Sequence, residues 1–211
     1  MMHPKICPSR DTVILSRDQK TADGAKQQIE SIHKFKIFNC KFGKGCFANE
    51  TIINGEIICF FKGEEISWDE FHKRYLQGRI RLDDPLQLSD NRYMQLYLPY
   101  ICFNHSCNPN AGFRGKNELV AFRNIMPGDE IYYDYSTVSW DDRWTKLHGA
   151  WSMRCECGEE NCRKLIGDFP TISPSQMKRY INLQLIPDFI LERLVREKDK
   201  TTAISSWLDW I

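Results

Sequence analysis

The 211-residue sequence lacks several features that would place it in other classes of protein. It has no run of about 18 apolar residues, so no transmembrane helix is expected. Residues 1–20 carry basic side chains but no apolar core of a secretory signal, and an intracellular location is therefore expected. The formal net charge is only +1, which argues against a broad nucleic-acid-binding surface. A globular protein of ordinary composition remains.

Glycine-rich cofactor motifs are also scarce. Gly43-Lys44-Gly45 lacks the third glycine and the following helix of a dinucleotide fingerprint, so a Rossmann-type methyltransferase is disfavoured. By itself this tripeptide is typical of a hairpin turn. The alternative is that its glycines let the backbone approach a ligand closely, and the residues alone leave both interpretations open.

Cysteine, in contrast, is abundant, with nine residues. Cys155, Cys157 and Cys162 form a Cys-x-Cys-x4-Cys cluster, one thiol short of a closed zinc site. Cys107, in the polar loop 104–110, is the natural fourth ligand. Without a secretory signal, metal binding in a reducing compartment is favoured over disulfides. We expect a structural zinc that fastens the C-terminal segment over the middle of the chain; unrelated buried thiols are the alternative.

Two other functions for these residues are disfavoured. His105 and Cys107 resemble a nucleophilic Cys–His pair, but their two-residue separation in a proline-bearing loop disfavours a productive hydrogen bond. A zinc-ribbon nucleic-acid binder is disfavoured because a second paired-cysteine knuckle is missing and the charge is near neutral.

Residues 128–135 are predicted to form a turn that leads into an aromatic strand. Strand alternation places Tyr133 and Tyr135 on one face and Tyr132 on the other. A lysine ammonium, with a pKa of about 10.4, becomes nucleophilic only after it loses its proton, and an apolar aromatic channel favours that loss. Tyrosine hydroxyls can orient the resulting amine. A tyrosine-rich core strand is the alternative.

The remaining pattern predicts a mainly β protein with some α-helix. Ser67 and Glu70 predict a capped helix that ends near Gly78. Residues 79–99 are expected to be an irregular insert, residues 1–30 an extension or short helix, and residues 173–196 two helices divided by Pro187. Short β-prone runs lie at 36–40, 46–48, 56–61, 118–122 and 130–135.

Five motifs in order resemble the SET-domain protein-lysine N-methyltransferases that carry a zinc-binding post-SET segment, in particular small stand-alone members. The motifs are GKG (43–45), GEIICFFKGEEIS (55–67), NHSCNPN (104–110), RNIMPGDEIYYDY (123–135) and CECGEENC (155–162). The resemblance implies several small β-sheets around a knot-like loop, followed by C-terminal helices. The implied divisions are an extension (1–34), the SET domain (35–136, insert about 67–99), the post-SET zinc segment (137–168) and a helical tail (169–211).

The resemblance implies transfer of a methyl group from S-adenosylmethionine to a protein lysine, with a histone tail as the substrate. We therefore expect a monomer that acts in the nucleus or on chromosomes. It is not expected to bind nucleic acid directly or to associate with a membrane. Many relatives have Glu-Tyr where this chain has Phe60-Phe61. That departure motivates the alternative, an inactive SET-like module that binds a peptide or chromatin partner.

The resemblance also implies roles for individual residues. Tyr135 is the catalytic tyrosine, assisted by Tyr133, and Tyr133 with Phe61 lines the substrate channel. Tyr133 suggests mono- or dimethylation, whereas Phe61 argues the other way, so the product state stays open. The implied methyl-donor site consists of Lys44, Gly45, Cys46, Asn104, His105, Tyr135 and Leu165. The implied zinc ligands are Cys107, Cys155, Cys157 and Cys162.

Overall fold

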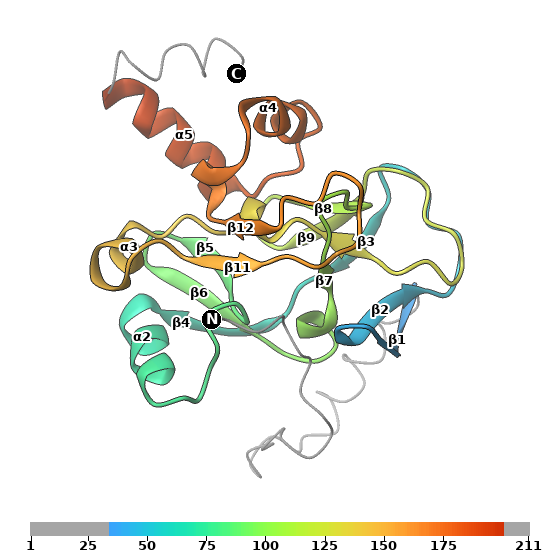
Figure 1. The fold of residues 1–211 in the computed structure, drawn as a ribbon, viewed down its shortest axis with the longest axis horizontal. Coiled ribbons are helices and arrows are strands. Elements are labelled where there is room, and N and C mark those ends of the chain that lie inside the picture. The colour runs from blue at the N-terminus through green and yellow to red at the C-terminus, as the bar shows by residue number, and fades with distance from the viewer. Residues whose placement is uncertain (1–33, 201–211) are drawn as a thin grey trace.

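The computed structural model describes residues 34–200, which fold into several small sheets with helices at their margins (Figure 1). The strands are β1 (Phe35–Cys40), β2 (Gly43–Ala48), β3 (Ile57–Phe60), β4 (Gly63–Ser67), β5 (Leu86–Ser89), β6 (Arg92–Leu96), β7 (Asn104–His105), β8 (Ala111–Arg114), β9 (Glu118–Ala121), β10 (Tyr132–Tyr133), β11 (Ser152–Arg154) and β12 (Leu165–Gly167). The helices are α2 (Trp68–Leu76), α3 (Asp142–His148), α4 (Pro174–Asn182) and α5 (Asp188–Lys200). The predicted mixture of mainly strands with some helices is confirmed.

The strands pair in short ladders, several of which join distant parts of the sequence. The sheets have the orders β1-β2, β4-β6-β5, β3-β9-β8, β7-β10 and β11-β12. All pairs are antiparallel except β7 with β10, which run parallel and place Asn104 beside Tyr132 and His105 beside Tyr133. This parallel pair brings the polar loop 104–110 against the aromatic strand.

Helix α2 begins where the capping pattern predicted. The Ser67 hydroxyl accepts a hydrogen bond of 3.2 Å from the backbone N–H of Glu70. Asp69 and Glu70 lie in the first turn, where acidic side chains favour the positive end of the helix dipole. Trp68 and Phe71 face the core, and the helix ends at Leu76, close to the predicted Gly78.

Three local predictions were wrong. The turn before β2 is formed by Lys41 and Phe42, so Gly43-Lys44-Gly45 lies within the strand. The insert 79–99 is not irregular throughout, because β5 and β6 pair with each other and with β4. The aromatic strand is limited to β10, and Tyr135 begins a 3-10 turn that ends at Val138. For the insert, pairing with the distant strand β4 determines the backbone path.

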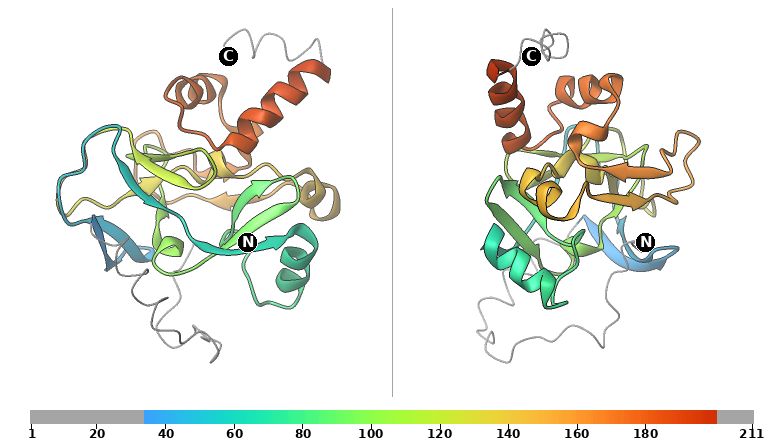
Figure 2. Two further views of the ribbon diagram at one scale, coloured as in Figure 1. Left: turned by 180° about the vertical axis from the view of Figure 1, so that it is seen from behind. Right: turned by 60° about the vertical axis from the view of Figure 1, so that its left-hand side comes forward.

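The two C-terminal helices form as predicted, separated by Pro187. Ser173 caps α4 by accepting from the backbone N–H of Gln176 at 3.4 Å, and Pro174 occupies the first turn. Figure 2 shows both helices stacked on the side of the molecule that carries β8 and β12. The segment between α4 and α5 packs closely on β8, because a Cβ added to Gly112 of β8 would lie 3.0 Å from Cβ of Leu185.

The described residues contain two hydrophobic clusters. The larger one includes Phe35, Phe61, Phe103 and Phe113, all fully buried beneath the small sheets. The smaller one is centred on Phe169 and joins α4 to α5. Within residues 34–200, every helix is too short or too polar to cross a membrane. The expected extension or helix at 1–30 lies outside the described residues.

Candidate active site

The four predicted metal ligands meet at one point. The sulfurs of Cys107, Cys155, Cys157 and Cys162 all lie within 4.8 Å of one another, and the Cys107 and Cys155 sulfurs are 3.7 Å apart. Four thiolates about 2.3 Å from a tetrahedral ion have sulfurs about 3.8 Å apart. The donor set and its spacing therefore fit a metal ion held by four sulfurs.

Close contact between these thiols couples their protonation. The hydrogen bond with Cys155 lowers the pKa of the Cys107 thiol, and the same contact raises the pKa of Cys155. Cys107 also accepts from the backbone N–H of Arg163 at 3.4 Å, which favours the thiolate. A dication at the centre would stabilise all four thiolates, so metal binding would release protons.

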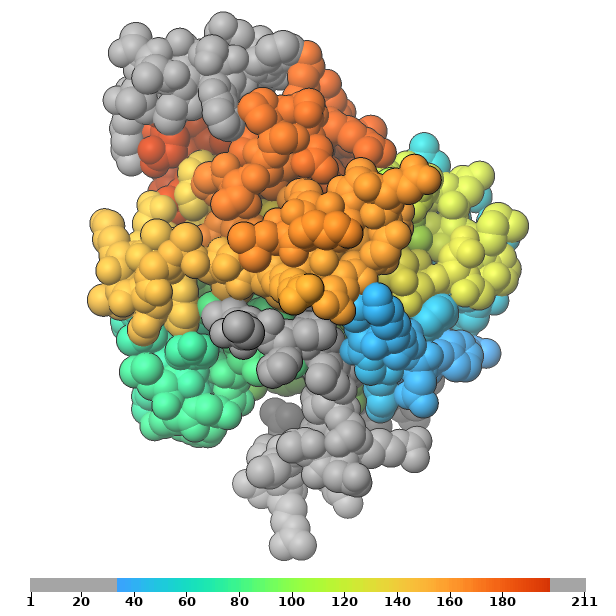
Figure 3. Space-filling view, viewed as in Figure 1, coloured from blue at the N-terminus to red at the C-terminus, as the bar shows by residue number. Residues whose placement is uncertain are grey.

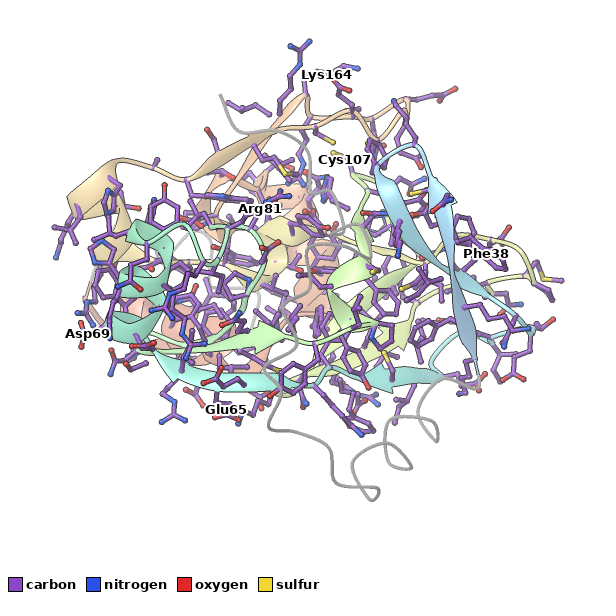
Figure 4. The ribbon with its side chains drawn as sticks, turned by 90° about the horizontal axis from the view of Figure 1, so that it is seen from below. Phe38, Glu65, Asp69, Arg81, Cys107 and Lys164 are labelled. Atoms are coloured by element: carbon purple, nitrogen blue, oxygen red, sulfur yellow. The ribbon has the colours of Figure 1, made fainter. Side chains whose placement is uncertain are left out.

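Glu159 and Asn161 join the cysteine-bearing segment to the polar loop. The Glu159 carboxylate accepts hydrogen bonds from Ser106 at 3.3 Å and from Asn108 at 3.2 Å. The Asn161 side chain donates to the carbonyl of Cys107 at 3.2 Å. Figure 4 shows Cys107 beneath this segment and beside the β1–β2 hairpin. These contacts place Cys107 against thiols that lie about fifty residues further along the sequence.

His105 connects the cysteine cluster to Tyr135. Its Nδ1 accepts from the backbone N–H of Tyr135 at 3.2 Å, and its Nε2 lies 3.3 Å from the Cys107 sulfur. The expectation that the two-residue separation disfavours a hydrogen bond between His105 and Cys107 is therefore wrong. Because Nδ1 accepts, the proton is on Nε2 and is donated to sulfur. The buried imidazole of His105 therefore contacts both Cys107 and the backbone of Tyr135, the predicted catalytic residue.

Asn104 fastens strand β2 to the same loop. Its amide donates to the carbonyl of Lys44 at 2.9 Å and to the Glu130 carboxylate at 2.7 Å. A Cβ on Gly45 would lie only 2.2 Å from Oε1 of Glu130, so the position requires glycine unless that side chain moves. The space beside Gly45 is therefore filled by Glu130, and close approach rather than a turn explains this glycine.

Tyr133 and Tyr135 lie side by side, with ring centroids 4.8 Å apart, whereas Tyr132 points elsewhere and donates to Glu130 at 2.7 Å. The Tyr135 hydroxyl donates to the carbonyl of Phe103 at 2.8 Å. The Tyr133 hydroxyl has no hydrogen-bond partner among residues 34–200. Burial raises the pKa of both tyrosines, so both hydroxyls stay protonated.

Two pockets meet at Tyr135. The first, which we call the aromatic pocket, is lined by the rings of Phe71, Tyr93, Tyr133, Tyr135, Trp144 and Trp151. The second, the loop pocket, is lined among others by Phe42, Asn104, His105, Tyr135, Met153 and Cys155. Tyr135 lines both, so this residue is shared by the aromatic pocket and by the loop pocket beside the cysteine cluster.

Some predicted site residues lie away from these pockets. Phe61 is fully buried and packs edge-to-face on Tyr133 with centroids 6.0 Å apart, which makes it a support behind that ring. Cys46 is also fully buried in β2. Leu165 is 62% exposed and does not line the loop pocket. Lys44 reaches the loop through its backbone carbonyl.

The sequence interpretation missed a buried ionic group next to Tyr135. The carboxylate of Asp134 accepts from Arg163 at 2.5 Å, from Tyr180 at 2.9 Å and from the backbone N–H of Ser136 at 3.1 Å. Asp134 is 1% exposed. A charged residue within an otherwise aromatic and apolar run was the available signal, since such a residue needs a buried partner. Its partners are too distant in sequence to be read from that run.

Comparison with known proteins assigns the central part of the chain. Residues 43–136 match the family model described as the SET domain. The chain is 34% identical over 144 residues to a Debaryomyces hansenii histone-lysine N-methyltransferase described as H3 lysine-36 specific, covering 59% of this chain and 18% of that protein. It is 31% identical over 137 residues to an H3 lysine-4 specific enzyme of Cryptococcus neoformans, covering 57% of this chain and 9% of that protein.

The methyltransferase domain of human SETMAR, a solved structure, is 24% identical, with a TM-score of 0.48 over 64% of this chain and 58% of that one. The part of the chain that matches the two fungal relatives spans less than a fifth of the length of either relative. The matched residues include β2, the polar loop, Tyr133 and Tyr135. Through residues 43–136, the chain belongs to the SET-domain family.

Proposed function

We propose that this protein transfers a methyl group from S-adenosylmethionine to the side-chain amine of a protein lysine. The observation that carries the proposal is the position of Tyr135, which lines both the loop pocket and the aromatic pocket. Two reactants can reach one aromatic ring from separate pockets. Membership of the SET-domain family supports the same assignment.

The loop pocket is the proposed donor site. Asn104 and His105 offer polar atoms there, and Phe42 offers an aromatic face. Lys44, Gly45 and Cys46 support this site from β2, and Leu165 lies at the exposed end of β12. When bound, S-adenosylmethionine supplies a sulfonium methyl group, whose carbon–sulfur bond breaks as the lysine nitrogen bonds to the methyl carbon.

Tyr133 and Tyr135 are the proposed groups that act on the amine. Both rings are buried, which disfavours a charged ammonium and favours the nucleophilic neutral amine. The Tyr133 hydroxyl, without a partner among the described residues, can hydrogen-bond that amine directly. Phe61 holds the Tyr133 ring from behind. Alignment and exclusion of water are the contributions expected from these residues.

The cysteine cluster is the proposed site of one structural zinc ion. Cys107, Cys155, Cys157 and Cys162 would leave no open coordination position, so the ion would not take part in the chemistry. Its proposed role is to hold the cysteine-bearing segment against the polar loop. Figure 3 shows residues near 150–165 (orange) packed beside the blue β1–β2 hairpin, where Lys41 donates to the carbonyl of Glu156 at 3.0 Å.

A histone is the proposed substrate, and the nucleus or chromosomes the proposed location. The relatives that support this proposal are described as specific for two different histone H3 lysines, so the target lysine is not assigned. We propose that the protein acts as a monomer.

The test uses isotope-labelled S-adenosylmethionine, a panel of core histones and mass spectrometry of the labelled lysine. Tyr135→Phe should bind the donor with unchanged affinity but lose about 100-fold or more in kcat. Tyr97→Phe is the matched control, because Tyr97 is 42% exposed and lines neither pocket. Undiminished transfer by Tyr135→Phe would refute its role. Failure of the wild-type protein to bind the donor by calorimetry would favour the non-catalytic peptide-binding module.

A further inference from the structure

The aromatic pocket extends beyond the two tyrosines that the proposed reaction uses. Trp151 and Asp168 also line it, directly beyond the Ser152–Gly167 pair at one end of the β11–β12 ladder. The Ser139 hydroxyl lies beside them and donates to the Asp168 carboxylate at 2.5 Å. Trp151 precedes the cysteine cluster in the sequence and Asp168 follows it, and the β11–β12 ladder brings the two residues together.

The pocket is acidic. Among residues 34–200, Asp83, Asp141 and Asp168 line it, and no lysine or arginine does. Two of these carboxylates are already committed to protein partners. Asp83 pairs with Arg81 at 2.8 Å, and the Asp141 carboxylate accepts from Trp68, Tyr93 and the backbone of Trp144.

Asp168 differs from the other two because its close side-chain donor is a neutral hydroxyl. The carboxylate is 8% exposed, and burial raises its pKa to about 6. Arg193 is close enough to lower the pKa of Asp168 electrostatically, but its guanidinium donates its hydrogen bonds to the carbonyl of Trp140 and to the carboxylate of Asp142. An incoming cation would therefore find a carboxylate that has no direct positive partner in the part of the chain that the structure describes.

Trp151 supplies an independent sign of a missing ligand. Its Nε1 is buried and has no hydrogen-bond acceptor among residues 34–200, and the residue is 7% exposed. Buried indole N–H groups usually find a partner. An acceptor that enters the pocket, such as a peptide carbonyl, would complete it.

We propose that Trp151 and Asp168 form a subsite for a basic residue of the protein substrate that lies close in sequence to the target lysine. The basic side chain pairs with Asp168, and a main-chain carbonyl of the same peptide accepts from Trp151. This proposal rests on the proposed lysine methyltransferase function. Arginine fits best, because its planar guanidinium stacks on aromatic rings while it bonds a carboxylate.

The experiment measures peptide specificity in wild-type protein, Asp168→Asn and Trp151→Phe. Histone-derived peptides around each methylated lysine are made with every flanking arginine or lysine replaced singly by glutamine, which keeps hydrogen-bonding capacity but removes charge. At one flanking position of the peptide, replacement of the basic residue by glutamine should raise the KM of the wild-type protein for that peptide about tenfold. Asp168→Asn should erase that discrimination while the donor Kd stays unchanged. Trp151→Phe should weaken the binding of all the peptides by a similar factor.

Asp69→Asn is the matched control, because Asp69 is an exposed carboxylate that lines neither pocket (Figure 4), and it should keep the wild-type pattern. Asparagine can still accept from Ser139, and thermal melting verifies that each variant is folded. Full discrimination in Asp168→Asn, or equal KM for arginine and glutamine peptides in the wild type, would overturn the proposal. Peptide affinity by fluorescence anisotropy tests the subsite even if no methyl transfer occurs, so the two proposals fail separately.

Discussion

The hydroxyl of Tyr180 in α4 donates a hydrogen bond of 2.9 Å to Oδ2 of Asp134, the residue directly before Tyr135. The other oxygen of that carboxylate accepts from Arg163, which follows the last cysteine of the cluster. One buried carboxylate therefore links the helical tail, the cysteine-bearing segment and the pocket tyrosine. This contact gives the helical tail a polar anchor beside the site.

Replacing Tyr180 with phenylalanine should lower the free energy of unfolding by about 2 kcal/mol, because a hydrogen bond to a buried charged group is lost. Asp134 keeps its bonds to Arg163 and Ser136, so the fold should survive. Urea denaturation measures the change, and Tyr97→Phe, at an exposed tyrosine, should leave stability within about 0.5 kcal/mol. Equal stability of the two variants would show that the Tyr180 bond contributes nothing.

Removing the proposed zinc should weaken binding of the proposed donor, S-adenosylmethionine, because His105 joins Cys107 to the backbone of Tyr135. Purified protein should contain one zinc per chain by elemental analysis, and Cys157→Ser should lose it. We expect donor affinity by calorimetry to fall about tenfold in this variant. Cys59→Ala, a buried cysteine outside the cluster, should keep both metal and donor affinity. Metal-free protein with full activity would contradict the coupling.

Stability should depend on pH through Asp168. Its pKa is raised from 3.8 to about 6, mainly by burial, so the folded state binds the proton more tightly than the unfolded state. The stabilisation is complete below pH 4 and is lost as the pH rises to about 6. The loss is roughly 3 kcal/mol. Asp168→Asn should remove this slope, as measured by urea denaturation between pH 4 and 7. Parallel pH profiles for the two proteins would be the contrary result.

Replacing Tyr133 with phenylalanine should shift the product toward higher methylation states. The hydroxyl lines the aromatic pocket without a partner among the described residues, so its removal leaves room for an additional methyl group. Mass spectrometry of a methylated peptide counts the methyl groups at each time point. Donor affinity should stay unchanged, and an identical product distribution in both proteins would argue against a role for this hydroxyl.

Several features could be predicted from sequence because neighbouring residues determine them. The Ser67 cap and the division of the tail at Pro187 depend on local backbone preferences. The cysteine cluster follows from ligand type and spacing, and the four thiols do meet. The ordered motifs identified the SET-domain family, which the match to residues 43–136 bears out.

Tertiary structure alone decided the rest. Strands β5 and β6 form because β4, about thirty residues earlier, pairs with β6, a non-local contact that the insert does not encode by itself. The same applies to Asp134, whose partners Arg163 and Tyr180 lie far along the chain. Local sequence sets backbone preference and ligand chemistry. Which buried charges and rings face one another depends on long-range packing, which placed Tyr135 in the lining of two pockets and Asp168 in the lining of one of them.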